Sequence, residues 1–314
     1  MTAARAVEVP TDDDLRRAAS VVARHLRPTP LVELSVPGAG QVLAKLETVQ
    51  PTGSFKVRGA LVALTGYAGR AVVTASAGNH GLAVAFAAAR LGMAATIVVP
   101  RTASTAKIEA LRRLGADLVL HGDGYEEAER HGLGLAMEGV YVSAYNDRYV
   151  IAGAATCTAE VLDAGLGECT LIVPVGGGGL ISGAVLRAAG RPDARVVGVE
   201  AAASCPVSTS VAAGREVVVR VDETLADGLA GNFEPGSVTL GVAASGTHTF
   251  ATVTEAEIAA AIRFLALDCG LVVEGAGAVG VAALMSGKVP VAGTPVVLLT
   301  GRNIAARTLG GILS

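Results

Sequence analysis

Lys56 is a residue whose type and position could support covalent chemistry. It follows residues 51–55 (Pro-Thr-Gly-Ser-Phe), a turn-forming run that predicts a helix beginning near this lysine. The positive end of the helix dipole disfavours an ammonium ion, so the amine loses its proton more easily there. A neutral lysine can form a Schiff base with an aldehyde. From position alone, however, a solvated surface lysine is the more common interpretation.

Residues 76–81 (Ser-Ala-Gly-Asn-His-Gly) form a second candidate site between a strand pattern and a helix pattern. Consecutive backbone N–H groups at the start of a helix bind anions such as a carboxylate or a phosphate. Ser76 and Asn79 add hydrogen-bonding side chains to those groups. The alternative is an ordinary helix start capped by Ser76 or Asn79, and this motif alone does not decide between the two.

Four consecutive glycines, Gly176 to Gly179, follow the apolar run 171–175 and precede Leu180. Glycine has no Cβ, so backbone N–H groups can surround a phosphate closely. Four such residues are costly in conformational entropy unless something approaches the backbone there. We therefore interpret this turn as a phosphate-binding loop rather than as a flexible connection.

Two further patterns resemble known motifs but lack the partners that those motifs need. Residues 275–280 fit GxGxxG, but residues 281–314 contain no acidic residue that could bind a ribose. Close helix packing explains these glycines, and a nicotinamide-binding oxidoreductase would rest on this pattern alone. Residues 104–107 (Ser-Thr-Ala-Lys) fit SxxK without its companion motifs, which favours a helix start.

The composition is that of a folded α/β protein and excludes nucleic acid and membrane as expected partners. The chain is 51% hydrophobic and 17% charged, with a net charge of −3 and no basic block. Residues 71–89 are apolar but interrupted by polar and glycine residues, so they do not predict a membrane-spanning helix. Residues 1–15 lack the apolar run of a signal peptide. The four cysteines are widely spaced and fit reduced thiols, so we expect a cytoplasmic protein.

Strand-like and helix-like segments alternate along the chain. Apolar strands of this kind indicate parallel sheets that are covered by helices on both faces. The sequence therefore predicts two α/β domains, with no boundary marked by composition. The predicted strands are residues 41–46, 71–75, 96–100, 117–121, 140–142, 171–175, 195–200 and 295–300. The predicted helices are residues 11–26, 55–64, 80–91, 104–114, 125–137, 180–189 and 255–269.

Six motifs, in this order, resemble those of the fold-type II pyridoxal-phosphate enzymes, specifically the threonine/serine dehydratase and serine racemase group. The resemblance covers nearly the whole chain, and it implies two open, mostly parallel α/β domains of the tryptophan synthase β type. By analogy, a small domain spans residues 71–147, and a large domain takes residues 1–70 and 148–314. The motifs are residues 27–31, 45–60, 76–81, 176–179, 274–278 and 299–303.

The resemblance also implies a role for each matched residue toward pyridoxal 5'-phosphate and a small amino acid substrate. Lys56 would carry the cofactor as a Schiff base and act as the base at Cα. Phe55 would pack against the cofactor ring, Asn79 would bind its 3-hydroxyl group, and Thr300 would face its pyridine nitrogen. The remaining residues expected at the cofactor are Gly176, Gly177, Gly178, Gly179, Leu180 and Glu274, and those expected at the substrate carboxylate are Ser76, Asn79 and His80.

Some residues depart from the pattern of this family. Serine racemases of the group have a serine at the position of Ala77, which serves as the acid on the opposite face, so we expect a dehydratase rather than a racemase. The members that bind a divalent metal use residues at the positions of Glu200, Ser204 and Pro206. Because Pro206 replaces their aspartate, we expect no metal. Arg302 stands where many members have glycine and would bring a cation close to Thr300.

We therefore expect pyridoxal-phosphate-dependent β-elimination from a β-hydroxy-α-amino acid such as L-threonine or L-serine, giving a 2-oxo acid and ammonia. A homodimer is the expected assembly, because cyclic dimers are the commonest oligomers. A phenylserine dehydratase or a 3-hydroxyaspartate dehydratase is an alternative, and the latter would need a further cation such as Arg148 or Arg302. A β-replacement synthase would share Lys56 and the glycine turn. A cofactor-binding protein without catalysis is a third class, which the presence of Lys56, Asn79 and Thr300 disfavours.

Overall fold

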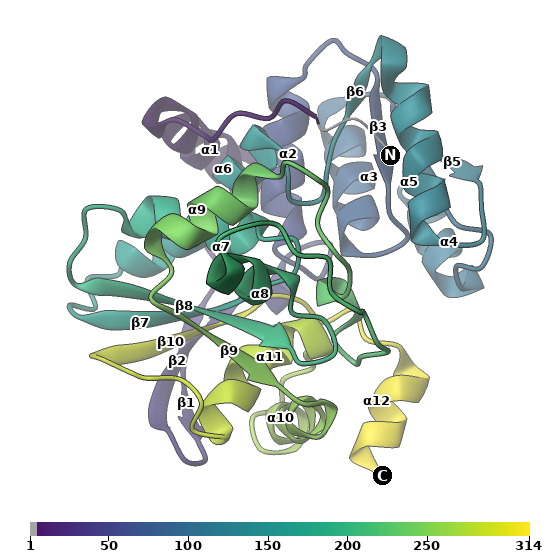
Figure 1. Ribbon diagram of the computed structural model, residues 1–314. Helices are drawn as coiled ribbons and strands as arrows, with labels where there is room; N and C mark the ends of the chain where they lie inside the picture. The colour runs from purple at the N-terminus through teal and green to yellow at the C-terminus, as the bar shows by residue number, and fades with distance from the viewer. Residues whose placement is uncertain (1–4) are drawn as a thin grey trace.

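The computed structural model describes residues 5–314, and two β-sheets organise this part of the chain. The larger sheet has the strand order β1-β2-β10-β7-β8-β9, and every neighbouring pair except β1–β2 is parallel. It lies in the lower left of the molecule in Figure 1. Its strands are β1 (Leu31–Val36), β2 (Gly40–Leu46), β7 (Cys169–Pro174), β8 (Ala194–Ala201), β9 (Thr249–Val253) and β10 (Thr294–Leu299).

The smaller sheet has four parallel strands in the order β5-β4-β3-β6. Figure 1 shows it in the upper right of the molecule. All four strands fall within residues 71–147, and the strand β3 leads directly into the motif at residues 76–81. The strands are β3 (Val72–Ala75), β4 (Ala95–Val99), β5 (Asp117–Leu120) and β6 (Val140–Tyr141).

Twelve α-helices connect and cover these strands in the described part of the chain. Several begin at the side chains that favour a helix start. Thr11 forms a capping box with Asp14, and Thr254 forms one with Glu257. The helices are α1 (Asp12–His25), α2 (Lys56–Gly66), α3 (Asn79–Leu91), α4 (Thr105–Arg113), α5 (Tyr125–Leu135), α6 (Arg148–Leu162), α7 (Gly179–Ala188), α8 (Pro206–Ala213), α9 (Val238–Gly246), α10 (Glu255–Leu267), α11 (Gly275–Met285) and α12 (Ala306–Leu313). Short 3-10 helices cover Glu47–Val49, Ala136–Glu138 and Asp227–Leu229.

Successive residues of a strand point to opposite faces of its sheet, because side chains alternate with a period of two. In the large sheet, Ile172 packs on the side of α10 and α11, whereas Leu171 packs on the side of α6 and α7. In the small sheet, Val98 packs toward α5, whereas Ile97 and Val99 pack toward α3 and α4. Both sheets are therefore buried on two faces.

The helix that carries Lys56 is held by a buried ion network. Arg58 is fully buried and contacts Glu47 at 2.8 Å and Glu160 at 2.6 Å. Lys45 on β2 also contacts Glu160, at 2.6 Å. Because α2 packs against both α3 and α6, this network fixes the start of α2 relative to the large sheet.

The predicted fold class is confirmed, since two mostly parallel α/β sheets are present. The glycines of residues 275–280 serve close packing, as expected: a Cβ on Gly275 would overlap the carbonyl of Leu225. Ser104 caps α4, which confirms the helix start assigned to residues 104–107. Of the helices described between residues 5 and 314, none has the length and apolar character needed to cross a membrane.

Candidate active site

Lys56 is the first residue of α2, and its amine is directed into the structure. Its Nζ donates a hydrogen bond to the carbonyl of Ala144 at 2.8 Å and lies 5.1 Å from the centre of the Phe55 ring. Burial lowers the pKa of this amine to about 8, and the nearby Glu274 carboxylate opposes that effect. An amine with this pKa is partly neutral near neutral pH, as a nucleophile or a general base must be.

The loop before α3 leaves its side chains free of a capping role. Gly78 is the N-cap residue, and neither Ser76 nor Asn79 caps the helix, so the capping interpretation is wrong. Ser76 instead accepts a hydrogen bond from the N–H of Gly78 at 3.2 Å. The N–H of Ser76 donates to the carbonyl of Val98 at 3.1 Å, which ties the loop to β4. Free backbone N–H groups and a serine hydroxyl therefore meet at the carboxyl end of β3.

His80 is buried and is directed toward the backbone rather than toward the loop. Its Nε2 lies 3.1 Å from the carbonyl of Val142, so the tautomer that donates there carries its proton on Nε2. Its Nδ1 has no partner among the described residues. Burial, and next the charge of Lys56, lower the pKa of His80 to about 3. The ring is therefore neutral, and its Nδ1 is an acceptor.

Asn79 joins two segments that are far apart in the sequence. Its Nδ2 donates to Glu274 at 2.7 Å, and its Oδ1 accepts from Asn303 at 2.6 Å. The backbone N–H of Asn303 also donates to Glu274, at 3.1 Å. Burial, and to a lesser extent Asp227, raise the pKa of Glu274 to about 7. The motifs at residues 76–81, 274–278 and 299–303 are thus brought together in space.

The four-glycine turn is packed so closely that side chains could not replace its hydrogens. A Cβ on Gly177 would overlap the ring of Tyr145, and one on Gly178 would lie 2.8 Å from Thr239 Cβ. Gly178 also has a φ of +88°, a conformation that favours glycine. Thr239 donates from its hydroxyl to the carbonyl of Gly177 at 2.8 Å. The turn leads into α7, so its backbone N–H groups form a cradle suited to phosphate.

Thr300 directly follows β10 and lies beside the start of α2. Its carbonyl accepts a hydrogen bond from the N–H of Phe55 at 3.0 Å. The residue is buried, and its hydroxyl has no hydrogen-bond partner within residues 5–314. A neutral hydroxyl without a protein partner is a suitable group to face the ring nitrogen of a pyridine.

The sequence alone assigns no role to two residues of the site. Tyr145 shapes the glycine turn, and its hydroxyl accepts from the N–H of Glu234 at 2.8 Å. Asn303 lies within a recognised motif but was given no role. Asn303 could have been found from its motif, whereas Tyr145 lies in an irregular segment without a pattern of its own.

Three residues that the sequence left open have structural partners elsewhere. Glu200 accepts hydrogen bonds from the N–H groups of Val207 and Ser208 at 3.0 and 2.9 Å, so its carboxylate holds the start of α8. Arg148 pairs with Glu8 and Asp14 at 2.5 and 2.7 Å. The Arg302 guanidinium donates to the carbonyl of Thr48. Arg148 is therefore engaged by two carboxylates, whereas Arg302 has no carboxylate partner among the described residues.

The fold and these groups define a class of enzyme: an open α/β protein with a lysine amine beside a phosphate-binding turn. Comparisons with known proteins agree. Residues 22–301 match the family of pyridoxal-phosphate dependent enzymes. An L-threonine ammonia-lyase from Thermotoga maritima is 38% identical, over 97% of this chain and 78% of the relative. The catabolic L-threonine dehydratase TdcB of Staphylococcus aureus is 35% identical, over 96% of this chain and 91% of the relative.

Solved structures show the same fold. Maize serine racemase superimposes with a TM-score of 0.88 at 29% identity, covering 97% of each chain. A fungal L-serine ammonia-lyase from Rhizomucor miehei superimposes with a TM-score of 0.79 at 27% identity, over 91% of this chain and 97% of that one. The chain belongs to the pyridoxal-phosphate dependent enzymes of fold type II, in the threonine/serine dehydratase and serine racemase group. Its cofactor is pyridoxal phosphate.

Proposed function

We propose that this enzyme is a lyase that removes the β-hydroxyl group and the amino group from L-threonine or L-serine, giving a 2-oxo acid and ammonia. The observation that carries the proposal is the Lys56 amine, with its pKa lowered to about 8, beside a glycine turn that admits no side chain. The relatives named L-threonine ammonia-lyase and L-threonine dehydratase support the reaction and the substrate.

The residues present fit the cofactor. The N–H groups of Gly176, Gly177, Gly178, Gly179 and Leu180 would hold its phosphate, since the tight turn that presents them leaves no room for side chains at residues 176–179. The Lys56 amine would attach it covalently, with Phe55 against the ring. Thr300 would face the pyridine nitrogen, and Asn79, held by Glu274, would bind the 3-hydroxyl group.

The reaction needs a base at Cα and an acceptor for negative charge. When bound, pyridoxal phosphate supplies an electron-withdrawing ring that stabilises the charge left at Cα. With the cofactor bound, the Lys56 amine would be the base that takes the α-proton, because burial favours its neutral form. Because Thr300 offers a hydroxyl and not a carboxylate, it does not hold the ring nitrogen protonated. An unprotonated ring nitrogen favours loss of the β-substituent over transamination.

The loop before α3 would hold the substrate carboxylate. Ser76 and Asn79 offer polar side chains, and the first N–H groups of α3 have no acceptor within the helix. The His80 ring is a neutral acceptor, so we assign the contact of His80 to its backbone N–H. Binding the carboxylate here orients Cα for proton removal by Lys56.

The residue at position 77 favours elimination over racemisation. Racemisation needs an acid on the face of Cα opposite Lys56, and the side chain at this position is the methyl group of Ala77. That methyl group packs against the cluster that contains Ala85, Ile97 and Leu111. We therefore expect little interconversion of L- and D-serine. The alternative, a 3-hydroxyaspartate substrate, is disfavoured because Arg148 is paired with Glu8 and Asp14.

We further propose a division into a small domain at residues 71–147 and a large domain at residues 1–70 and 148–314. The separate sheets support this division. A homodimer in the cytoplasm is the assembly and location that we expect of such an enzyme. Size-exclusion chromatography with light scattering tests the dimer.

A substrate panel tests the proposed reaction. Release of 2-oxo acid is measured from L-threonine, L-serine, D-serine, L-threo-phenylserine and threo-3-hydroxyaspartate with added pyridoxal phosphate. We expect turnover of L-threonine or L-serine and little of the dicarboxylate. Turnover of activated serine only in the presence of an added nucleophile, with little 2-oxo acid, would instead identify a β-replacement synthase.

A further inference from the structure

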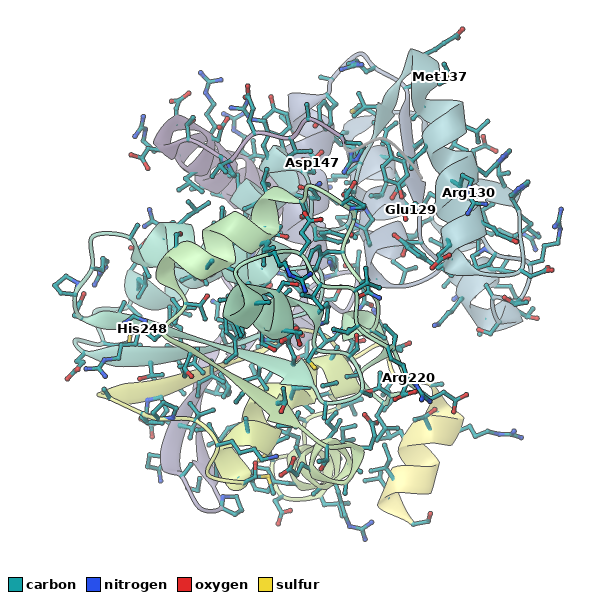
Figure 2. All side chains as sticks on the ribbon, viewed as in Figure 1. Glu129, Arg130, Met137, Asp147, Arg220 and His248 are labelled. Carbon is teal, nitrogen blue, oxygen red and sulfur yellow. The ribbon has the colours of Figure 1, made fainter. Side chains whose placement is uncertain are left out.

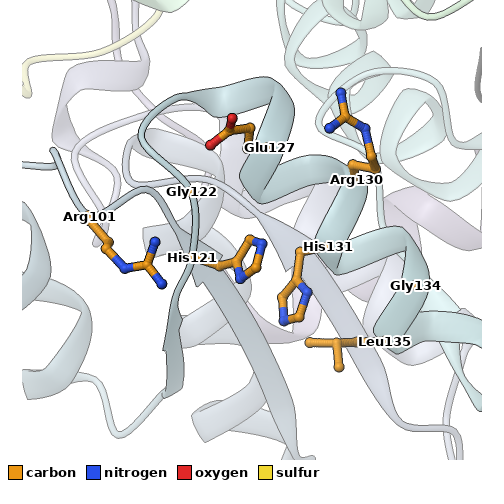
Figure 3. A pocket seen from close by; sticks show the side chains of 8 residues that line it. All are labelled: Arg101, His121, Gly122, Glu127, Arg130, His131, Gly134 and Leu135. Carbon is orange, nitrogen blue, oxygen red and sulfur yellow. The ribbon is translucent and has the colours of Figure 1, made fainter.

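A cavity of about 530 Å³ lies on the small sheet, where β4 and β5 end and α5 passes (Figure 3). Open parallel sheets bind ligands outside the carboxyl ends of their strands. The volume falls in the range of about 300–1,000 Å³ that ligand pockets commonly have. Figure 2 shows Arg130 on α5, and none of the residues that line the cavity belongs to the candidate active site. The cavity is therefore separate from the candidate active site.

Two histidines stack on each other in this cavity. The ring centres of His121 and His131 are 3.9 Å apart, and the ring planes differ by 8°. His121 follows β5, and His131 lies on α5. Figure 3 shows the two rings face to face. In the part of the chain that the structure describes, neither ring forms a hydrogen bond, so four ring nitrogens are available to a ligand.

Two arginines line the same cavity. Arg101 follows β4, and its N–H donates to the carbonyl of Gly122 at 2.8 Å, which ties together the loops after β4 and β5. Arg130 lies on α5, one residue before His131. Within residues 5–314, neither guanidinium has a carboxylate or carbonyl partner. The cavity thus gathers unpaired donors from three segments.

Glu127 is the one carboxylate that lines the cavity. Its Oε2 accepts a hydrogen bond from the N–H of Asp123 at 2.8 Å, so the loop after β5 already uses it. With Arg101 and Arg130, it leaves a charge of +1 (two positive, one negative) when both imidazoles are neutral. An oxyanion is the ligand that this set of groups favours, because the two guanidinium groups outnumber the single carboxylate.

The geometry is unsuited to a metal ion. The lone pairs of stacked imidazoles lie in two parallel planes, whereas zinc needs ligand nitrogens that converge on one point at about 2.0–2.1 Å. Neighbouring guanidinium groups also repel a cation. We propose that this cavity binds a phosphate dianion, either free or carried on a small organic molecule whose remainder would lie beside Leu135. Arg101 and Arg130 would bind the oxygens, and the ring nitrogens of His121 and His131 would add hydrogen bonds.

Calorimetry on the holoenzyme, with excess cofactor removed, tests this proposal. Sulfate is the first probe, because it has the tetrahedral oxygens and the two negative charges of a phosphate dianion. We expect sulfate to bind saturably to the wild-type protein. Arg101→Gln should weaken binding by about tenfold or more. Arg90→Gln, an exposed arginine at the end of α3, is the matched control and should change nothing.

Three further measurements make the test decisive. His131→Gln should weaken sulfate binding while the protein keeps its cofactor absorbance. Glycerol 3-phosphate and inorganic phosphate distinguish an organic from a free ligand by which one binds more tightly. Absence of sulfate and phosphate binding, an equal loss in Arg90→Gln, or binding of Zn²⁺ without binding of oxyanions would overturn the proposal.

Discussion

Asn79 donates a hydrogen bond to Glu274 over 2.7 Å, and this bond joins the start of α3 on the small sheet to the start of α11 on the large sheet. Asn303 contacts both partners, so three segments meet at one carboxylate. The carboxylate is buried, and burial raises its pKa to about 7. The junction of the two sheets therefore depends on the protonation of one side chain.

Glu274 should make stability depend on pH. Its pKa is higher in the folded chain than in the unfolded chain, so the folded state binds the proton more tightly. The free energy of unfolding should fall as pH rises from about 4.5 to about 7, by up to ~3 kcal/mol. Glu274→Gln should lack this fall. Urea unfolding of the cofactor-free protein across this range measures both curves, and parallel curves would contradict the assignment.

Lys56 should react with its cofactor at a lower pH than an ordinary lysine. Its pKa is about 8, so the reactive neutral amine becomes abundant above that pH instead of above about 10.4. The rate at which the cofactor-free enzyme gains visible absorbance with pyridoxal phosphate should rise through pH 8 and then level off. Stopped-flow absorbance records this profile. A rate that keeps rising beyond pH 10 would show that the amine is not perturbed.

Gly177→Ala should weaken cofactor binding. The added methyl group would overlap the Tyr145 ring, so the turn must shift and its N–H groups lose their arrangement. We expect the dissociation constant of pyridoxal phosphate to rise by about tenfold or more. Gly241→Ala is the matched control, because its Cβ meets nothing within 4 Å. Fluorescence titration of both variants makes the comparison, and equal affinities would exclude the turn as the phosphate site.

Arg58→Met should destabilise the fold strongly. The substitution leaves the fully buried Glu47 without its partner, and loss of one member of a buried pair costs about 3–5 kcal/mol. Arg191→Met removes a pair with Asp193 that is exposed to solvent, and should change little. Chemical denaturation of the two variants provides the test. Similar midpoints would mean that the network around Arg58 does not hold α2.

Much of the fold follows from the strand pattern. The strands β3, β4, β7, β8 and β10 are short apolar runs between turns. Because both faces of these strands are buried, their residues are apolar and the sequence predicts them as strands. The helix α6 was not predicted, because eleven of its fifteen residues are buried and no polar face marks its period. Strand β1 was also missed. It pairs antiparallel with β2 at the edge of the sheet, and its buried and exposed residues do not alternate regularly along the strand.

The site was predictable only as separate motifs. Lys56, Asn79, Gly176 and Thr300 could be named from the sequence, but the sequence did not say which side chains would bond to each other. The Asn79–Glu274 bond spans 195 positions, and only the packing of the two sheets brings these residues together. The stacking of His121 on His131 could not be predicted from the sequence for the same reason, since the two rings come from a loop and a helix.

Lys56→Ala offers the most direct test of the account. The variant is compared with Lys107→Ala, which replaces an exposed lysine on α4. Release of 2-oxo acid from L-threonine and L-serine is measured together with the visible absorbance of the bound cofactor. We predict that Lys56→Ala loses both signals and that Lys107→Ala keeps both. Retention of activity by Lys56→Ala would contradict the central role of this amine.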